Sequence, residues 1–204
     1  MAELLFLFAG MPLLFFFKII DIPFIPMLCF FALLANGLLR HDRRFRYDDL
    51  WKTNTKRTVY LSILLIFIPI AVGMSLLAYR IDPYYFFFLP KSHPLLWVLV
   101  LIFYPLISVL PQGLVYRALF FRRYGKLFGS QWGTILASAF FFSLGHILFR
   151  NWIAVALSFA GGLLFAYRYY KNNSLVPSLF EHILYGWWLF TCGLGIFFFH
   201  GDFH

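Results

Sequence analysis

Residues 58–79, TVYLSILLIFIPIAVGMSLLAY, run without a charged side chain from Thr58 to Tyr79. A helix of about 20 apolar residues matches the hydrocarbon thickness of a bilayer. The rest of the chain is similar, because 62% of its 204 residues are hydrophobic, only 12% are charged, and the mean hydropathy is +0.81. Soluble domains carry about a quarter charged residues. The sequence therefore predicts an integral membrane protein.

Six further apolar runs accompany this stretch, and the seven together predict an all-α, polytopic helical bundle. Glu3 stands where a cleavable signal peptide would carry basic residues, so we expect no such signal. We expect a single membrane domain, with N-terminal helices and a basic loop in residues 1–90 and a motif-bearing core in residues 91–204. The predicted spans cover residues 4–17, 22–39, 58–79, 94–121, 132–149, 152–167 and 175–199.

The net charge of +9 lies in short loops at the ends of these runs. A nucleic-acid-binding domain gathers its basic residues on one folded face, so no nucleic-acid partner is expected. If the loop 40–57 is cytoplasmic, twelve Lys and Arg fall inside and four outside, as the positive-inside rule requires. The N-terminus is then inside and residues 200–204 are outside. The inner group is Arg40, Arg43, Arg44, Arg46, Lys52, Lys56, Arg57, Arg122, Arg123, Lys126, Arg168 and Lys171, and the outer group is Lys18, Arg80, Lys91 and Arg150.

Polar residues inside a span need a reason, because an Arg or Asp at a helix centre costs roughly 2.5–3.5 kcal/mol on insertion scales. The first such stretch ends the run 94–121. There Gln112 and Gly113 lie four residues before Tyr116 and Arg117, so each pair lies on one helix face. The alternative for Arg117 is that it extends to the cytoplasmic interface.

Two further polar stretches lie in the fifth and last runs. Phe142 and His146 share a helix face, although a lone buried histidine is as often a structural residue as a catalytic one. Glu181 and His182 are adjacent and can line one broad cavity wall. An ionised Glu181 needs a cation, and Arg117 is the candidate in kind, either within an active site or as a purely structural pair.

Together the three stretches resemble the CAAX prenyl protease and bacteriocin-processing family of intramembrane proteases, over residues 95–199. That family carries Glu-Glu-x-x-x-Arg, then Phe-x-x-x-His, then a third-motif His followed four residues later by Asn, Asp or a substitute. Arg117 matches the first motif, Phe142 and His146 the second, and His182 the third. The chain is also similar to a branch with Pro-Gln-Glu-x-x-Tyr-Arg and Glu-His-x-x-Tyr-Gly.

The resemblance implies an intramembrane endopeptidase that uses water to cleave a membrane-associated peptide or protein. His146 and His182 would polarise the water or bind the oxyanion, and Arg117 would orient a carboxylate, here Glu181. No cofactor is expected: two histidines and one glutamate could bind zinc, but the resemblance favours a glutamate-type site. The expected location is a bacterial inner membrane with the N-terminus in the cytoplasm.

The chain departs from that family at the two glutamates of the first motif, where it carries Gln112 and Gly113. Neither can act as a general base, since glutamine cannot accept a proton at neutral pH and glycine has no side chain. Three alternatives follow: Glu181 substitutes, the chain is a catalytically inactive binding or assembly subunit, or Gly113 is a variant of a natural glutamate. A small transporter that uses the buried polar residues is a further alternative.

The depth of the two histidines sets a geometric requirement. At 1.5 Å per residue, His146 lies about 20 Å into its span and His182 about 10 Å into its own. Both spans start from the same side. Convergence therefore requires a tilted helix, a late start of the fifth helix, or a half-spanning hairpin around Arg150 and Asn151.

Overall fold

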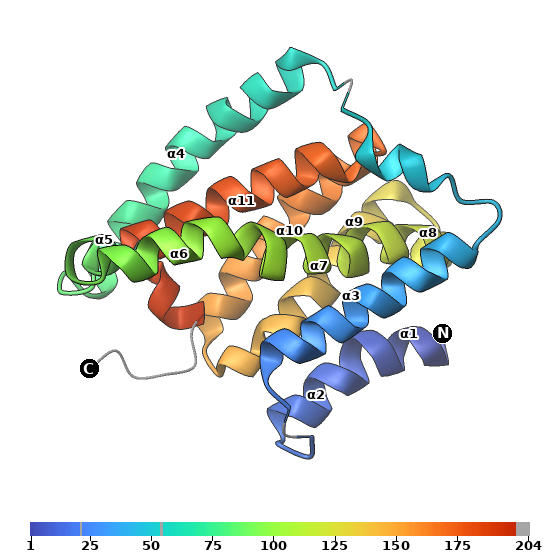
Figure 1. Cartoon of the computed structure of the whole chain (residues 1–204), viewed down its shortest axis with the longest axis horizontal. Coiled ribbons are helices and arrows are strands. Elements are labelled where there is room, and N and C mark those ends of the chain that lie inside the picture. The colour runs from blue at the N-terminus through green and yellow to red at the C-terminus, as the bar shows by residue number, and fades with distance from the viewer. Residues whose placement is uncertain (21, 54, 199–204) are drawn as a thin grey trace.

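The computed structural model describes residues 1–20, 22–53 and 55–198, and all regular structure within these ranges is helical (Figure 1). The longer elements are α3 (Phe24–His41), α4 (Arg57–Ile81), α6 (Pro94–Tyr104), α9 (Gln131–Gly145), α10 (Trp152–Asn172) and α11 (Leu175–Cys192). The shorter ones are α1 (Ala2–Leu5), η1 (Phe6–Gly10), α2 (Met11–Phe16), η2 (Tyr47–Trp51), α5 (Phe88–Ser92), η3 (Pro105–Val109), α7 (Leu110–Gly113), η4 (Leu114–Leu119), α8 (Phe120–Tyr124), η5 (Gly125–Phe128), η6 (His146–Phe149) and η7 (Leu194–Phe198).

Four helices in the described part of the chain are long and apolar enough to cross a membrane: Arg57–Ile81, Pro94–Phe128, Gln131–Phe149 and Trp152–Asn172. The predicted count of seven spans is therefore not shown. The first two predicted spans appear as shorter apolar helices, Ala2–Phe16 and Ile25–His41. The last predicted span is also shorter, because α11 ends at Cys192 rather than at Phe199. Phe199 and residues 200–204 lie outside the described residues.

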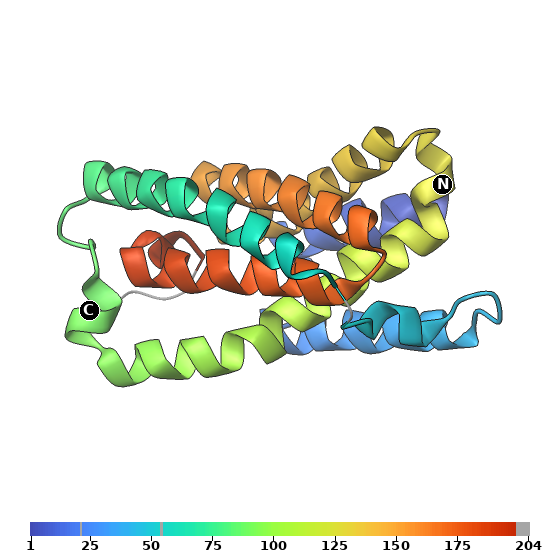
Figure 2. The ribbon, with the colours of Figure 1, turned by 90° about the horizontal axis from the view of Figure 1, so that it is seen from above.

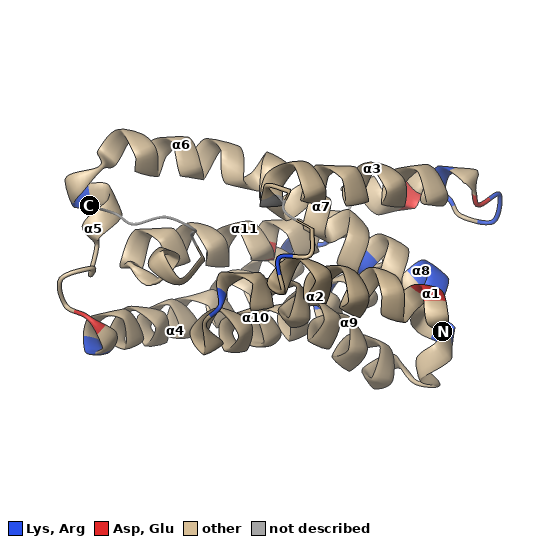
Figure 3. Cartoon of the chain, turned by 90° about the horizontal axis from the view of Figure 1, so that it is seen from below, with Lys and Arg blue, Asp and Glu red and all other residues tan. Residues whose placement is uncertain are grey.

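Helix α11 lies between two rows of helices. Figure 2 shows α4 and α10 on one side of it and α6 with α3 on the other, and the view from below in Figure 3 gives the same order. Charged residues lie mainly toward the two ends of the bundle, and many Lys and Arg gather beside α8 and the loop after α3 (Figure 3). This distribution suits a bundle whose middle lies in hydrocarbon.

The helix between Pro94 and Phe128 changes its winding at its prolines. Pro105 begins the π-helical turn η3, and Pro111 lies in α7 between η3 and the second π-helical turn, η4. Proline has no N–H, so Pro105 leaves the carbonyl oxygen of Leu101 without its helical donor. The indole nitrogen Nε1 of Trp187 donates to that oxygen at 2.9 Å. This link joins the interrupted helix to α11, and π-helical turns are frequent at functional sites.

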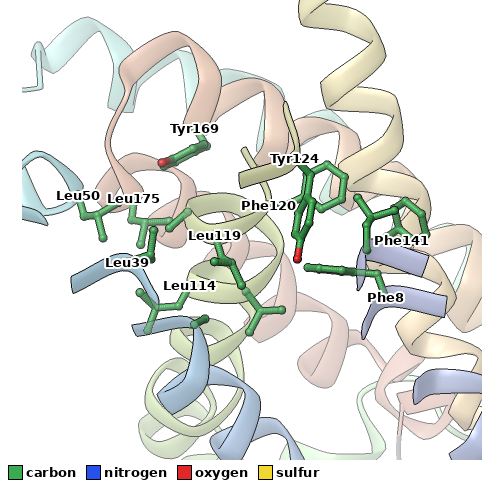
Figure 4. Packing of buried hydrophobic residues seen from close by; sticks show 14 residues of the cluster. Phe8, Leu39, Leu50, Leu114, Leu119, Phe120, Tyr124, Phe141, Tyr169 and Leu175 are labelled. Carbon is green, nitrogen blue, oxygen red and sulfur yellow. The ribbon is translucent and has the colours of Figure 1, made fainter. Parts of the chain in front are cut away.

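An aromatic cluster and two ion pairs attach the N-terminal helices to the rest of the chain. The Phe8 ring packs edge-on against the rings of Phe120, Tyr124 and Phe141, at centroid distances of 5.3, 5.7 and 5.9 Å (Figure 4). The Arg123 guanidinium donates to both oxygens of Glu3, at 2.9 and 3.0 Å. These contacts hold α1 and η1 against α8 and α9.

The second ion pair joins the end of α3 to α8. Arg122 Nε donates to Asp42 Oδ2 at 2.7 Å, and the backbone N–H of Arg44 donates to Oδ1 of the same carboxylate at 3.0 Å. These hydrogen bonds, Arg122 first, hold the pKa of the Asp42 carboxyl below its ordinary value. The pair is exposed, so it contributes little to stability on its own.

The turn between α9 and α10 follows directly after the predicted site residue His146. Helix α9 ends at Gly145, the 3₁₀ turn η6 carries the chain from His146 to Phe149, and Arg150 adopts a left-handed conformation with φ 57°. Asn151 then caps α10, because its Oδ1 accepts from the backbone N–H of Ala154 at 2.8 Å. His146 therefore lies at the end of α9, and Figure 1 shows α9 and α10 inclined to α11.

Gly193 ends α11 with φ 110°, a conformation that favours glycine. A Cβ at this position would overlap the backbone carbonyl oxygen of Tyr85. We therefore expect Gly193→Ala to lower the free energy of unfolding by about 1–3 kcal/mol, the usual range for backbone strain. Thermal unfolding of the purified protein in detergent measures the change.

Gly73→Ala in α4 is the matched control, because an added Cβ there meets nothing within 4 Å. It is expected to be neutral or to stabilise by up to about 1 kcal/mol, the difference in helix propensity. Equal melting temperatures for the two variants would contradict this account of how α11 ends.

Candidate functional site

A cavity of about 720 Å³ lies among α3, α4, α6, α10 and α11. Its walls are mostly apolar, with side chains such as Leu99, Phe103 and Leu164. None of the residues of α6, all of which are described, is buried in the protein. Polar lining residues are Tyr104, Ser108, Gln112, His146, Ser158, His182 and Tyr185. The cavity therefore combines apolar walls with polar groups from several helices.

His146 projects from the end of α9 and is 8% exposed. Its Nδ1 lies 2.8 Å from the carbonyl oxygen of Phe142, one turn earlier. A carbonyl oxygen can only accept, so Nδ1 carries the proton and donates. In the neutral ring, Nε2 then has a free lone pair. The spacing Phe-x-x-x-His thus fixes one tautomer of His146 through the backbone.

His182 comes from α11 and is 6% exposed. Its ring stacks on Phe165 at a centroid distance of 4.4 Å, with an interplanar angle of 22°. Its Nε2 lies 3.2 Å from the hydroxyl oxygen of Tyr104 in α6. Its Nδ1 is buried and has no hydrogen-bond partner among the described residues.

The ring of Phe142 connects the two histidines. It contacts His146 at a centroid distance of 4.6 Å and His182 at 5.7 Å. Both imidazoles also line the same cavity. The convergence that the sequence required is therefore present, and it is reached with His146 at the end of an inclined helix.

The neighbouring residues Gln112 and Gly113 face different parts of the protein: Gln112 faces the cavity, and Gly113 faces α11. Gln112 lines the cavity, its Nε2 donates to Ser108 Oγ at 3.1 Å, and its Oε1 is buried without a partner in the described part of the chain. Gly113 faces α11, where a Cβ would meet Leu179 Cδ2 at 2.5 Å. Leucine thus covers the position where the resemblance would put a glutamate.

Arg117 is 1% exposed, so it does not extend to the interface as the alternative for it required. Its guanidinium lies over the rings of Phe142 and Phe165, 4.3 and 5.2 Å from their centroids. Both rings line the cavity. Nη1 and Nη2 have no hydrogen-bond partner among the residues described. An unpaired buried cation is costly, and the aromatic faces offset part of that cost.

The motif residues of this site lie in a stretch of the chain that matches a known protein family. Residues 94–188 match the family described as type II CAAX prenyl endopeptidase Rce1-like. This stretch, less than half of the chain, is similar to that family and is named the Rce1-like domain. No curated protein and no solved structure matches the chain. The Rce1-like domain contains Arg117, Phe142, His146 and His182, the four motif residues on which the resemblance rested.

The prediction that Arg117 pairs with Glu181 is wrong. Glu181 is 0% exposed, and Arg168, not Arg117, binds it: Nε and Nη2 of Arg168 donate to its two oxygens, each at 3.0 Å. Arg168 Nη1 also donates to Ser62 Oγ in α4 at 3.0 Å. Glu181 is not among the described residues that line the cavity. Its carboxylate faces α10, whereas the neighbouring His182 faces the cavity.

The sequence missed two residues of the Rce1-like domain. Arg168 looked like a loop cation because Lys171 follows closely, yet Glu181, a lone carboxylate within an apolar run, signalled that a buried cation exists. Tyr104 lies in an apolar stretch that gave no signal.

Within the described residues, no three His, Cys, Asp or Glu side chains come together as a metal-binding group.

The Arg168–Glu181 pair can be tested by a double-mutant cycle. Removing one partner leaves an uncompensated buried charge, so Arg168→Leu and Glu181→Leu are each expected to destabilise by about 3–5 kcal/mol. The double variant should lose less than the sum of the two, since an apolar pair of similar size is often neutral. Denaturant unfolding in detergent gives the coupling energy. Additive effects would show that the two side chains do not depend on each other.

Proposed function

We propose that this chain is an intramembrane endopeptidase that cleaves a membrane-associated peptide or protein in the cavity beside α11. The observation that supports this proposal concerns polar atoms at this apolar cavity. Several of them have no hydrogen-bond partner in the described part of the chain. They are Gln112 Oε1, His182 Nδ1 and Tyr185 Oη in its wall, with Nη1 and Nη2 of Arg117 beside it. A peptide bond and a water molecule supply the donors and acceptors that such atoms need.

The family match supports a protein substrate, because the Rce1-like domain belongs to a group described as prenyl endopeptidases. The apolar walls of the cavity suit a substrate that is already held in the membrane, since they offer few polar contacts away from the histidines. We propose that the scissile bond lies beside His146, His182 and Gln112, which all line the cavity.

His146 is the proposed general base. Its Nδ1–H is engaged by the Phe142 carbonyl, so Nε2 can take a proton from a water molecule. The water oxygen forms a bond to the carbonyl carbon, and the carbonyl electron pair moves to the oxygen. The imidazolium then returns the proton to the leaving nitrogen as the carbon–nitrogen bond breaks. This assignment replaces Glu181, whose two oxygens are bound by Arg168.

His182 and Arg117 are the proposed stabilisers of the negative charge on that oxygen. Arg117 has two unpartnered nitrogens and lies over Phe142, the ring that contacts both histidines. A cation in a site that excludes water acts more strongly on developing charge than it does in solution. The burial of Arg117 supports the proposal that it stabilises negative charge that develops inside the cavity.

Binding without cleavage is the second candidate, and one observation favours it. None of the described residues that line the cavity is a carboxylate, and Gln112 and Gly113 stand at the two glutamate positions. Such a chain would hold a membrane peptide or act as an assembly subunit. The two candidates differ in whether the histidines affect turnover or only affinity.

Cleavage of a library of membrane peptides by the purified chain separates the candidates. His146→Ala is expected to lower kcat by about 10²–10⁴-fold, the usual contribution of a general base. His182→Ala should lower it by about 10²–10³-fold, as the loss of an oxyanion donor does. Peptide binding that persists without any cleavage by the unchanged chain would favour the second candidate and reject the first.

Gly113→Glu tests the first motif directly. A carboxylate at position 113 lies one turn before Arg117, whose Nη atoms have no partner among the described residues. We expect the variant to raise kcat, with the Leu179 side chain moving aside. Gly113→Gln is the matched control, because it has the same size without the charge and should not raise kcat. Equal rates for both variants would attribute any gain to packing rather than to the carboxylate.

The proposed orientation places the basic end, with the loop 40–57, in the cytoplasm. With Cys29 and Cys192 replaced by alanine, Arg43→Cys and Lys91→Cys report on the two ends. We expect a membrane-impermeant maleimide to label position 91 in intact cells and position 43 only after permeabilisation. The reverse pattern would invert the topology.

A further inference from the structure

Three polar contacts hold α6 against α11 in an antiparallel ladder. Trp97 Nε1 donates to Thr191 Oγ1 at 3.0 Å, and Trp187 Nε1 donates to the Leu101 carbonyl at 2.9 Å. The last rung joins Tyr104 Oη to His182 Nε2 at 3.2 Å. The first two rungs fix the position of α6, and only the third reaches the candidate site.

Gly186 makes room for this third rung. It lies one turn after His182 on α11, and a Cβ there would overlap Cε1, Cζ and the hydroxyl oxygen of Tyr104. One turn further on, Phe190 packs edge-on against the same tyrosine at a centroid distance of 5.4 Å. The Tyr104 ring therefore lies along one face of α11, over the glycine, with its hydroxyl directed at the histidine.

His182 has no other polar partner among the described residues. Two aromatic rings also contact it: Phe165 stacks on it at 4.4 Å and Phe142 meets it edge-on at 5.7 Å. Its Nδ1 is unpartnered. Aromatic rings restrict the plane of an imidazole but do not choose which nitrogen carries the proton. That choice is set by the hydrogen bond that one nitrogen makes.

We infer that Tyr104 is a positioning residue for His182: its hydroxyl, admitted by Gly186, donates to Nε2, which fixes the orientation of this imidazole and leaves the ring proton on Nδ1. The inference rests on the proposed function for its effect on catalysis. Its structural content, the coupling of Tyr104, Gly186 and His182, stands on the contacts alone. Tyr104 acts through His182 rather than on the substrate.

Tyr104→Phe removes the hydroxyl and keeps the ring. We expect kcat to fall about 10- to 100-fold with KM unchanged, the loss that follows when a histidine loses its orienting partner. Thr191→Val is the first control, because it breaks a rung of the ladder that does not touch His182. Tyr169→Phe is the second control, since it removes a phenol hydroxyl from a buried ring that does not line the cavity. Both controls should retain the wild-type kcat.

A compensating pair tests the role of Gly186. Gly186→Asn alone should lower kcat, because its side chain displaces the Tyr104 ring. Tyr104→Ala alone should lower kcat as well. In the double variant the asparagine amide lies one turn from His182 and has the space that the tyrosine leaves, so part of the lost kcat should return. A double variant slower than both single variants would overturn the coupling.

A spectroscopic readout separates this inference from the proposed function. The side-chain ¹⁵N resonances of labelled histidines report which ring nitrogen is protonated, and His182→Gln identifies the His182 signals. We expect Tyr104→Phe to shift them and Thr191→Val to leave them in place. Unchanged His182 signals in Tyr104→Phe would overturn the inference. Shifted signals in a chain that cleaves no peptide would uphold the coupling and reject the proposed function.

Discussion

Hydrocarbon does not solvate an ionised side chain, and the pairing of Glu181 with Arg168 meets that constraint for two of the buried charges of this bundle. Arg168 engages both carboxylate oxygens of Glu181 and also Ser62, so one guanidinium joins α10, α11 and α4. Adjacent positions of a helix diverge by about 100°. Because Glu181 is held against α10, the next residue, His182, faces the cavity. The ion pair thus fixes the rotation of α11 that directs the His182 side chain into the site.

Aromatic rings surround the polar groups of this site. Phe142 contacts both histidines and lies under the Arg117 guanidinium, and Phe165 stacks on His182 while also facing Arg117. Apolar rings keep the polar groups separate, and their faces still stabilise a cation. These contacts offset part of the cost of burying an arginine and two histidines at a cavity whose described lining residues include no carboxylate.

The sequence predicted the parts of the molecule that depend on local pattern. The charge-free run 58–79 predicted α4, and the motif spacings predicted Arg117, His146 and His182, which the structure brings together around the Phe142 ring. Partner choice depends on tertiary packing, so the sequence assigned Glu181 to Arg117 and placed Arg168 in a loop. The early end of α11 had a usable signal in Gly193, a residue type that commonly ends helices.

Two glycines, at positions 113 and 186, stand at motif positions where the family resemblance allows polar side chains, although the branch with Glu-His-x-x-Tyr-Gly has a glycine at the second position. Their neighbours fill the two positions in opposite ways. Over Gly186 lies the Tyr104 ring, which brings a hydroxyl to His182. Against Gly113 lies Leu179, which brings only methyl groups. His182 therefore keeps a polar partner, whereas the two Nη atoms of Arg117 have none in the described part of the chain. The departure from the family is thus unequal, because it preserves the orientation of an imidazole but leaves a buried cation to be neutralised from within the cavity.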